Sequence, residues 1–173
     1  MDPTDVQAQP DRPTPEALRA AADARAATFG RLVALLMASP RHAGMTLAEA
    51  NAHVAAAVAL GQFALVSAQQ AENGPLAVAA AAWWAFVSPD VDQRLSESRD
   101  AHLRLQPQDW RSGDQPWVIE AIGEAKVVNE LVGKLAERYF KGKPAKIRAH
   151  LPDGRIAVGH IGPRQPASAQ PKA

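Results

Sequence analysis

The stretch Leu76-Ala-Val-Ala-Ala-Ala-Ala-Trp-Trp-Ala-Phe-Val87 is apolar at every position, and it decides the expected fold. A strand that is buried on both faces has such a continuous apolar run, whereas a half-exposed strand alternates between apolar and polar residues. The run is too short to cross a bilayer, which needs about 20 residues. We therefore expect it to be a core strand of a sheet that is covered on both faces.

Further strand signals lie on both sides of this run. Residues 63–67 form a short strand before it, and the Asn-Gly pair at 73–74 is a strong hairpin signal between the two. Residues 117–122 are a second apolar core strand, and a final hairpin is expected over 146–161. These segments predict a mostly antiparallel sheet.

Two helices are expected before the first strand. Thr14 is suited to be an N-cap, and apolar residues at helical spacing continue from it to Ser39-Pro40, where proline ends the helix. Gly30 is a point at which this helix could divide in two. Residues 46–49, Thr-Leu-Ala-Glu, are a capping box that begins a second helix, and Gly61 closes that helix.

Two more helices are expected among the later strands. Ser88-Pro89-Asp90 begins a short third helix, and apolar residues at helical spacing mark a fourth across 126–140. A strand, a helix and a strand around 117–150 would make a right-handed crossover. The whole pattern predicts an α+β fold with a mostly antiparallel central sheet flanked by helices.

One folded domain is expected between two disordered arms. The 173 residues fit a single domain, and the hydrophobic content of 47% is sufficient for a core. Residues 1–13 and 162–173 are rich in proline and have little that could pack, so both are expected to be disordered. The folded domain then covers residues 14–161.

The composition excludes several classes of function. The chain has no cysteine, so disulfides, thiolate metal sites and cysteine nucleophiles are excluded. The formal net charge of +1 argues against nucleic acid as a partner, because nucleic-acid-binding domains are strongly basic. The N-terminus lacks the features of a signal peptide and no run is long enough to span a membrane, so we expect a cytoplasmic protein.

Histidine supplies the candidates for proton transfer near neutral pH. His42 stands out, because it follows the helix end at Ser39-Pro40 in a loop that rigid neighbours hold. His53 lies beside the apolar face of the second helix, where a structural role is favoured. No pair of histidines has the spacing of metal ligands, so we expect no zinc site. The other histidines have no distinctive surroundings: His102, His150 and His160.

Glu120 interrupts the apolar strand 117–122, where alternation puts it on one face with Val118 and Ile122. A buried carboxylate must be paired, hydrogen-bonded or protonated. Glu120 is therefore either an edge residue that reaches solvent or a carboxylate that orients a histidine. Ser39 is a weaker candidate, a nucleophile with His42 as its base, since a serine before proline usually marks only a helix boundary.

Basic residues gather around the last helix and the strand that follows it. One interpretation is a solvated face whose positive charges stabilise the C-terminus of the helix. The other is a surface that docks an acidic partner. The phosphate-binding glycine patterns are absent. The basic residues are Lys134, Arg138, Lys141, Lys143, Lys146 and Arg148.

Three segments resemble the RTX toxin-activating lysine acyltransferases, whose best-known members activate hemolysin and adenylate cyclase toxins. Leu35-Leu-Met-Ala-Ser-Pro-Arg-His42 is similar to the family's segment that ends in Ser-Pro-x-His, and Ala82-Trp-Trp-Ala85 continues the match. The match is most specific at Asp109-Trp-Arg-Ser-Gly-Asp-Gln-Pro-Trp-Val-Ile119, which resembles the family's Asp-Trp-x-Ser-Gly-Asp run. The resemblance covers roughly residues 30–160.

The resemblance implies a GNAT-like acyltransferase fold, fatty acyl-acyl carrier protein as the co-substrate, and internal lysines of an RTX protoxin as acceptors. It implies no tightly bound cofactor, and a homodimer remains compatible with it. It assigns the catalytic histidine to His42 and the family's catalytic aspartate to the position of Glu120, where glutamate keeps the charge and adds a methylene group. The segment 123–129 also departs from the family, which usually has proline and more glycine there.

The chemistry then expected is general-base catalysis. His42 takes a proton from the lysine amine, Glu120 holds the imidazole, and backbone N–H groups of its strand bind the thioester oxyanion. The basic residues Lys134, Arg138, Lys141, Lys143 and Arg148 meet the acidic carrier protein. Two alternatives remain open: a non-catalytic relative that binds the carrier protein or the toxin, and a GNAT-type transferase that uses acyl-coenzyme A.

Overall fold

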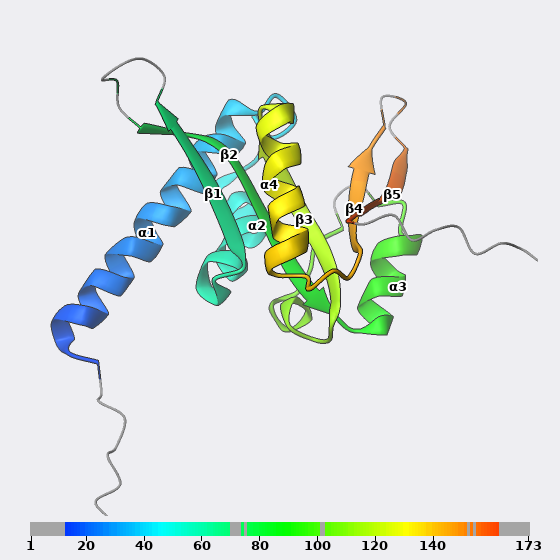
Figure 1. Cartoon of the computed structure of the whole chain (residues 1–173), viewed down its shortest axis with the longest axis horizontal. Coiled ribbons are helices and arrows are strands. Elements are labelled where there is room, and N and C mark those ends of the chain that lie inside the picture. Colours follow the sequence, from blue (N-terminus) through cyan, green and yellow to red (C-terminus); the bar gives the residue numbers. More distant parts are fainter. Residues whose placement is uncertain are drawn as a thin grey trace, which may run out of the picture.

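The computed structural model describes residues 13–69, 74, 76–100, 103–151, 153 and 155–162 (Figure 1). These residues form four α-helices, a short 3-10 helix and one five-stranded sheet. The elements in chain order are α1 (Pro15–Ala38), α2 (Leu47–Leu60), β1 (Phe63–Gln69), β2 (Leu76–Val87), α3 (Pro89–Glu97), η1 (Pro107–Trp110), β3 (Gln115–Gly123), α4 (Ala125–Arg138), β4 (Ala145–His150) and β5 (Ile156–Ile161).

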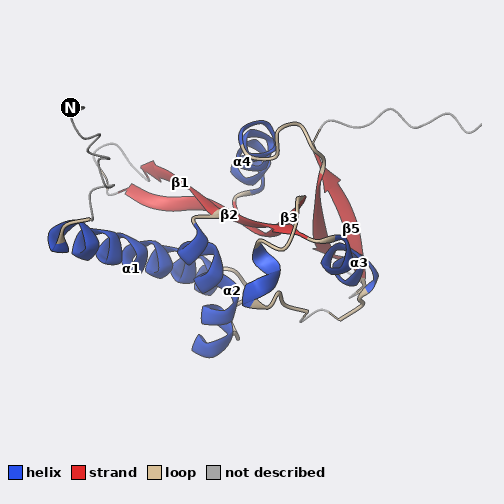
Figure 2. Cartoon of the chain, turned by 90° about the horizontal axis from the view of Figure 1, so that it is seen from below, coloured by secondary structure: helices blue, strands red, loops and turns tan. Residues whose placement is uncertain are grey.

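The sheet confirms the predicted α+β class. Its strands follow the order β1-β2-β3-β4-β5, and every neighbouring pair is antiparallel except β3 and β4, which are parallel and connected through α4. Figure 2 shows the layers: α4 lies on one face of the sheet, and α1, α2 and α3 lie on the other. No helix among the described residues is both long and apolar enough to cross a membrane.

Strand β2 is buried on both faces, as its continuous apolar run predicts. Trp83 packs into the core cluster on the side of α1 and α2, and Trp84 packs into the cluster on the side of α4. Both side chains are at most 2% exposed. Because successive side chains of a strand point to opposite faces, adjacent tryptophans anchor two separate cores.

The helix ends follow the predicted caps, with one difference. Thr14 accepts the N–H of Ala17, and the capping box of α2 has both of its hydrogen bonds. Gly61 ends α2 with a φ of 66°, a left-handed conformation that favours glycine. Gly30, in contrast, does not divide α1, which runs as one helix of 24 residues because the apolar spacing continues through this position.

Some predictions fall on residues outside the described part. The hairpin between β1 and β2 is confirmed by their antiparallel pairing, but Asn73 in its turn lies outside the described residues, as does Gly154 in the last hairpin. Residues 1–12 and 163–173, which make up nearly all of the two predicted arms, also lie outside them.

A β-bulge in β3 changes the expected face of Glu120. Trp84 pairs with Val118 and Trp83 pairs with Glu120, so Ile119 is an extra residue with no Cα partner in these pairings. Val118 therefore packs on the side of α4, while Ile122 and the contacts of Glu120 lie on the side of α1 and α2. The prediction that Glu120 shares a face with Val118 is wrong, because a bulge shifts the alternation by one residue.

Gly113 allows the motif before β3 to pack directly against the end of β2. A Cβ atom at this position would lie 2.5 Å from the carbonyl oxygen of Val87 and 2.6 Å from the Cα of Ser88, both backbone atoms. We expect Gly113→Ala to lower the free energy of unfolding by about 1–3 kcal/mol through overpacking. Urea unfolding checks this, with Gly30→Ala as the control. Gly30 is helical and has open space around it, so alanine there should stabilise the protein by about 0.5–1 kcal/mol.

Candidate active site

The loop between α1 and α2 holds His42 in a fixed place. α1 ends at Ala38, and the N–H of Ser39 donates to the carbonyl of Leu36. Two further turns follow, in which the N–H of His42 donates to Ser39 and the N–H of Met45 donates to His42, both at 2.9 Å. These backbone hydrogen bonds direct the imidazole toward strand β3, where it is only 8% exposed.

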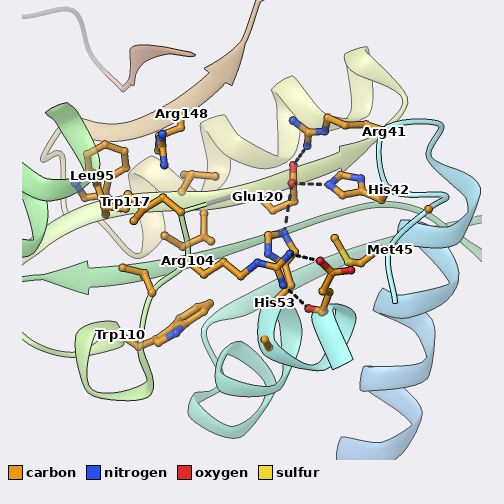
Figure 3. Close-up of a pocket in the computed structure, with 17 residues that line it drawn as sticks. Arg41, His42, Met45, His53, Leu95, Arg104, Trp110, Trp117, Glu120 and Arg148 are labelled. Atoms are coloured by element: carbon orange, nitrogen blue, oxygen red, sulfur yellow. Dashed lines mark hydrogen bonds and ion pairs between the residues drawn. The ribbon is translucent and has the colours of Figure 1, made fainter. Parts of the chain in front are cut away.

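His42 and Glu120 meet, as the sequence predicts. His42 Nε2 lies 3.1 Å from Glu120 Oε2 (Figure 3), and His42 Nδ1 lies 3.2 Å from Ser39 Oγ. Glu120 is 8% exposed, so the alternative of an edge glutamate that reaches solvent is wrong. The three candidate catalytic residues thus form a chain of serine, histidine and carboxylate.

Glu120 is the centre of a positively polarised cluster. Arg41 pairs with its Oε1, the N–H of Ala121 donates to the same oxygen at 3.0 Å, and His53 Nε2 lies 3.5 Å from Oε2. Burial raises the pKa of Glu120, but the hydrogen bond from His42, the close approach of His53 and the charge of Arg41 outweigh burial and hold that pKa well below its usual range. Glu120 is therefore ionised at neutral pH.

The ionised carboxylate fixes the proton on His42. A carboxylate can only accept hydrogen bonds, so His42 Nε2 must carry the proton that is shared with Glu120. The basic nitrogen of the neutral ring is then Nδ1, which faces the hydroxyl of Ser39. In this arrangement the carboxylate stabilises the ring once Nδ1 has gained a proton, as carboxylates do in catalytic triads.

His53 belongs to this site, although its sequence context favours a structural role. It extends from α2 with its ring edge-on to Trp83, at a centroid distance of 5.4 Å, and 6.0 Å from the ring of His42. The sequence offered one signal for including His53, namely a titratable side chain at the inward edge of an alanine-rich helix. That signal does not identify Glu120 as the partner, because the contact depends on how α2 crosses the sheet.

A cavity of about 400 Å³ extends from the cluster (Figure 3). His42, His53 and Glu120 line one side of it, together with Arg41. The rest of the wall contains Glu49, Arg104 and Arg148 as well as apolar residues, which pack in one core cluster. These apolar residues are Leu95, Leu103, Leu105, Trp110 and Trp117.

A second hollow, of about 440 Å³, lies beside Ser39. It is lined by the end of α1, by Pro40 and Arg41, and by the end of β3 at 121–123. Ser39 contributes to this hollow and His42 to the cavity, so the chain Ser39–His42–Glu120 connects two openings. The imidazole lines only the cavity, and the second hollow is connected to it through the Ser39 hydroxyl.

The predicted basic cluster divides between the two faces of the sheet. Lys134, Arg138 and Lys141 are exposed on and after α4. On the other face, Lys146 pairs with Asp92 of α3, and Arg148 donates to the carbonyl oxygens of Ser98 and Asp100. The structure pairs Lys143 with Asp114.

The remaining histidines lie away from the cavity or outside the described side chains. His160 is exposed on β5. His150 belongs to β4, but its side chain is outside the described part, and so is the whole of His102.

Comparison with known proteins identifies the family. The family model of the RTX toxin acyltransferases matches residues 22–158, which include every element from α2 to β4 and both members of the His42–Glu120 pair. The chain belongs to the RTX toxin acyltransferase family. It is also 33% identical over 114 residues to the lysine-acyltransferase RtxC of Vibrio cholerae serotype O1, an alignment that covers 65% of this chain and 68% of RtxC.

Membership in the RTX toxin acyltransferase family confirms the resemblance seen in the sequence. It indicates that the reaction at this site is acyl transfer. The matched region contains both the Ser-Pro-Arg-His segment and the Asp-Trp-Arg-Ser-Gly-Asp run that carry that resemblance. The first segment supplies His42. The second leads into β3, which supplies Glu120.

Proposed function

We propose that this RTX toxin acyltransferase moves a fatty acyl group from an acyl carrier protein thioester to internal lysines of an RTX protoxin. The observation that carries the proposal is the buried pair of His42 and Glu120 in the wall of a cavity that also has an apolar part. A base and an apolar chamber are the two features that fatty acylation of an amine requires. Action in the cytoplasm and self-association as a homodimer remain predictions that accompany this proposal.

His42 supplies the base. A lysine amine has a pKa of about 10.4 and attacks a thioester only after it has lost a proton. The amine nitrogen bonds to the thioester carbonyl carbon, its proton passes to His42 Nδ1 directly or through the Ser39 hydroxyl, and the carrier thiolate leaves. Glu120 stabilises the charged imidazole at this stage. The hollow beside Ser39 gives the lysine access to the Ser39 hydroxyl, through which the proton reaches Nδ1.

The bulge in β3 provides a donor for the thioester oxygen. Ile119 has no Cα partner in the pairings of β3 with β2 or with β4, and it lines the cavity next to Glu120. Its backbone N–H is our candidate for the oxyanion donor, because bulges leave one residue of the ladder unpaired. β3 and β4 pair only at Trp117 and Val118, so the sheet has no further pairing between these strands at the level of Glu120. A GNAT-like arrangement remains a prediction that rests on the family resemblance.

The apolar side of the cavity accommodates the acyl chain. Its wall is rigid, because the indole N–H of Trp117 donates to Asp92 Oδ1 at 2.6 Å while Lys146 binds the other oxygen of the same carboxylate. Trp110 and Leu105 pack in the same cluster and are at most 8% exposed. A wall of this kind limits the length of the chain that fits.

The exposed basic residues of α4 are the part of the predicted cluster best placed to meet an acidic carrier protein. Lys134, Arg138 and Lys141 face solvent. Lys143, Lys146 and Arg148 are paired within the chain, so their predicted role in donor binding is less favoured than that of the other three. Charged side chains on such surfaces mainly raise the rate of association.

The proposal is tested by co-expressing the chain with an RTX protein and searching for acylated lysines by mass spectrometry. Purified acyl-carrier-protein and acyl-coenzyme A donors are then compared at equal concentration. We expect acyl-lysine with the carrier-protein donor. Product only with coenzyme A would contradict the proposed donor, and no product in any format would contradict the enzymatic function and support a binding protein.

Chain-length selection follows from the apolar wall. We expect Leu105→Phe to shift the product toward shorter acyl chains, because phenylalanine takes up part of the cavity. Each methylene group of the acyl chain that no longer fits should lower kcat/KM for that donor by about tenfold or more. A mixture of octanoyl to stearoyl donors and mass analysis of the acylated peptides measures the shift. Leu18→Phe on the exposed side of α1 is the matched control. An unchanged distribution in Leu105→Phe would show that the chain lies elsewhere.

A further inference from the structure

Two imidazoles and one carboxylate converge on a single point of the cavity. His42, His53 and Glu120 each offer one ligand atom, and these atoms lie within 4.8 Å of one another. The two histidine Nε2 atoms lie 3.1 Å and 3.5 Å from the same oxygen, Glu120 Oε2. No spacing in the sequence indicated this convergence, because the three residues come from a loop, a helix and a strand.

Two of the three separations are close to those of a zinc site, and the third, between the two histidine nitrogens, is within 4.8 Å and must shorten when an ion binds. With bonds of about 2.0–2.2 Å to nitrogen and oxygen, tetrahedral coordination places neighbouring ligand atoms about 3.3–3.5 Å apart. A set of three ligands from histidine and a carboxylate, with one open position, is typical of zinc bound in a cavity. All three residues line the cavity, so its open space supplies the fourth position for a water molecule.

His53 gives independent support. Its Nε2 is a buried atom without a hydrogen-bond partner among the described residues, and it points toward Glu120. A buried polar atom that lacks a partner is costly in free energy. A metal ion between His53 and Glu120 would satisfy this nitrogen.

We propose that His42, His53 and Glu120 form a binding site for Zn²⁺, and that Zn²⁺ inhibits the enzyme by occupying it.

The inhibition follows from the two tautomers of His42. In the metal-free site Nε2–H donates to Glu120 and Nδ1 is the base. A zinc ion needs the lone pair of Nε2, so the ring proton must move to Nδ1 and donate to Ser39 Oγ, 3.2 Å away. Histidines that bind metals usually donate their other N–H to such an oxygen. With Nδ1 protonated and Nε2 bound to zinc, His42 cannot accept the proton of a lysine.

Arg41 is expected to weaken the binding of Zn²⁺ at this site, so that binding is reversible. Its guanidinium pairs with Oε1 of Glu120 and leaves Oε2 for the metal, but its positive charge repels a cation at this distance. The site is therefore expected to bind Zn²⁺ more weakly than a structural zinc site. This fits a ligand that inhibits and is removed by a chelator.

The test uses metal-free protein and Zn²⁺ alone, so it does not depend on the proposed acyl transfer. We expect calorimetry to show one ion bound per chain, and Co²⁺ to give the visible absorption of a four-coordinate site. Losing a residue that only hydrogen-bonds a metal ligand typically weakens metal binding by about 10–100-fold. Ser39→Ala, which removes such a residue, should weaken Zn²⁺ binding by about tenfold. His53→Asn, which removes a ligand, should weaken it by more than about 100-fold. His160→Asn, an exposed histidine on β5, is the matched control and should bind as the wild type does.

Two results would overturn the zinc site. One is unchanged binding in both His53→Asn and Glu120→Gln, and the other is the absence of binding in the wild type. Two variants are used so that poor folding of one, which circular dichroism will reveal, does not decide the test. Where acyl transfer is measurable, Zn²⁺ should inhibit it and EDTA should restore it. Zinc binding without inhibition would contradict the regulatory part of the proposal and leave the proposed acyl transfer untouched.

Discussion

Replacing His42 with alanine should lower kcat for acyl transfer by about 10²–10⁴-fold, the usual contribution of a positioned general base. The physical reason is that His42 Nδ1 is the acceptor of the lysine proton, and alanine leaves that proton without an acceptor. The rate is measured with purified carrier-protein donor and an RTX acceptor segment by following the mass of the acceptor.

The control for this variant is His160→Ala, which changes an exposed histidine of β5 and should keep the wild-type rate. Circular dichroism and a melting curve must show that His42→Ala is folded, since His42 is buried beside the core. A folded His42→Ala protein with at least half of the wild-type rate would contradict the assignment of the base.

Replacing Glu120 with glutamine should also reduce kcat, by about 10²–10⁴-fold and by no more than His42→Ala does. Exchanging the carboxylate for an amide in the comparable position of a serine protease triad costs about 10⁴-fold, because the histidine adopts the wrong tautomer. Glutamine keeps the size of the side chain and removes its charge, so it neither fixes the proton on His42 Nε2 nor stabilises the charged ring. Kinetics over a range of pH values measure this loss.

Glu120→Gln should also change how stability depends on pH. The pKa of Glu120 is lowered in the folded state, so the unfolded state binds a proton first as the solution is acidified. The stabilisation is complete above the unfolded pKa of about 4.3 and is lost as pH falls toward the lower folded pKa. Melting temperatures should therefore fall more steeply below pH of about 5 in the wild type than in Glu120→Gln. Equal slopes would show that Glu120 is not ionised in the folded protein.

Much of the fold follows from local signals that do not depend on tertiary context. The run from Leu76 to Val87 predicts a strand buried on both faces, and Thr14, the capping box at 46–49 and Gly61 predict helix ends that the structure confirms. Gly30 is the exception, since a glycine in a long apolar helix costs only about 1 kcal/mol and does not force a break.

Part of the site could also be predicted. His42 follows a proline-bounded helix end, and Glu120 interrupts an apolar strand, so each is anomalous within a few residues of sequence. The role of His53 and the face of Glu120 could not be predicted in this way. The first depends on how α2 crosses the sheet, and the second depends on the bulge at Ile119, which has no local signature such as glycine.

The division of the basic cluster also depends on tertiary structure. Lys134 and Lys146 are close in the sequence. Lys134 belongs to α4, however, whereas the side chain of Lys146 points to the opposite face of the sheet, toward α3. Lys146 is then paired with Asp92, which lies 54 positions away in the sequence.

The most direct test of the central claim is a double-mutant cycle on kcat with wild type, His42→Ala, Glu120→Gln and the double variant. If the imidazole and the carboxylate act as one unit, the second substitution adds almost nothing, and the double variant is about as slow as His42→Ala alone. If the two losses multiply, each residue acts by itself, and the account of a carboxylate that works through the histidine is contradicted.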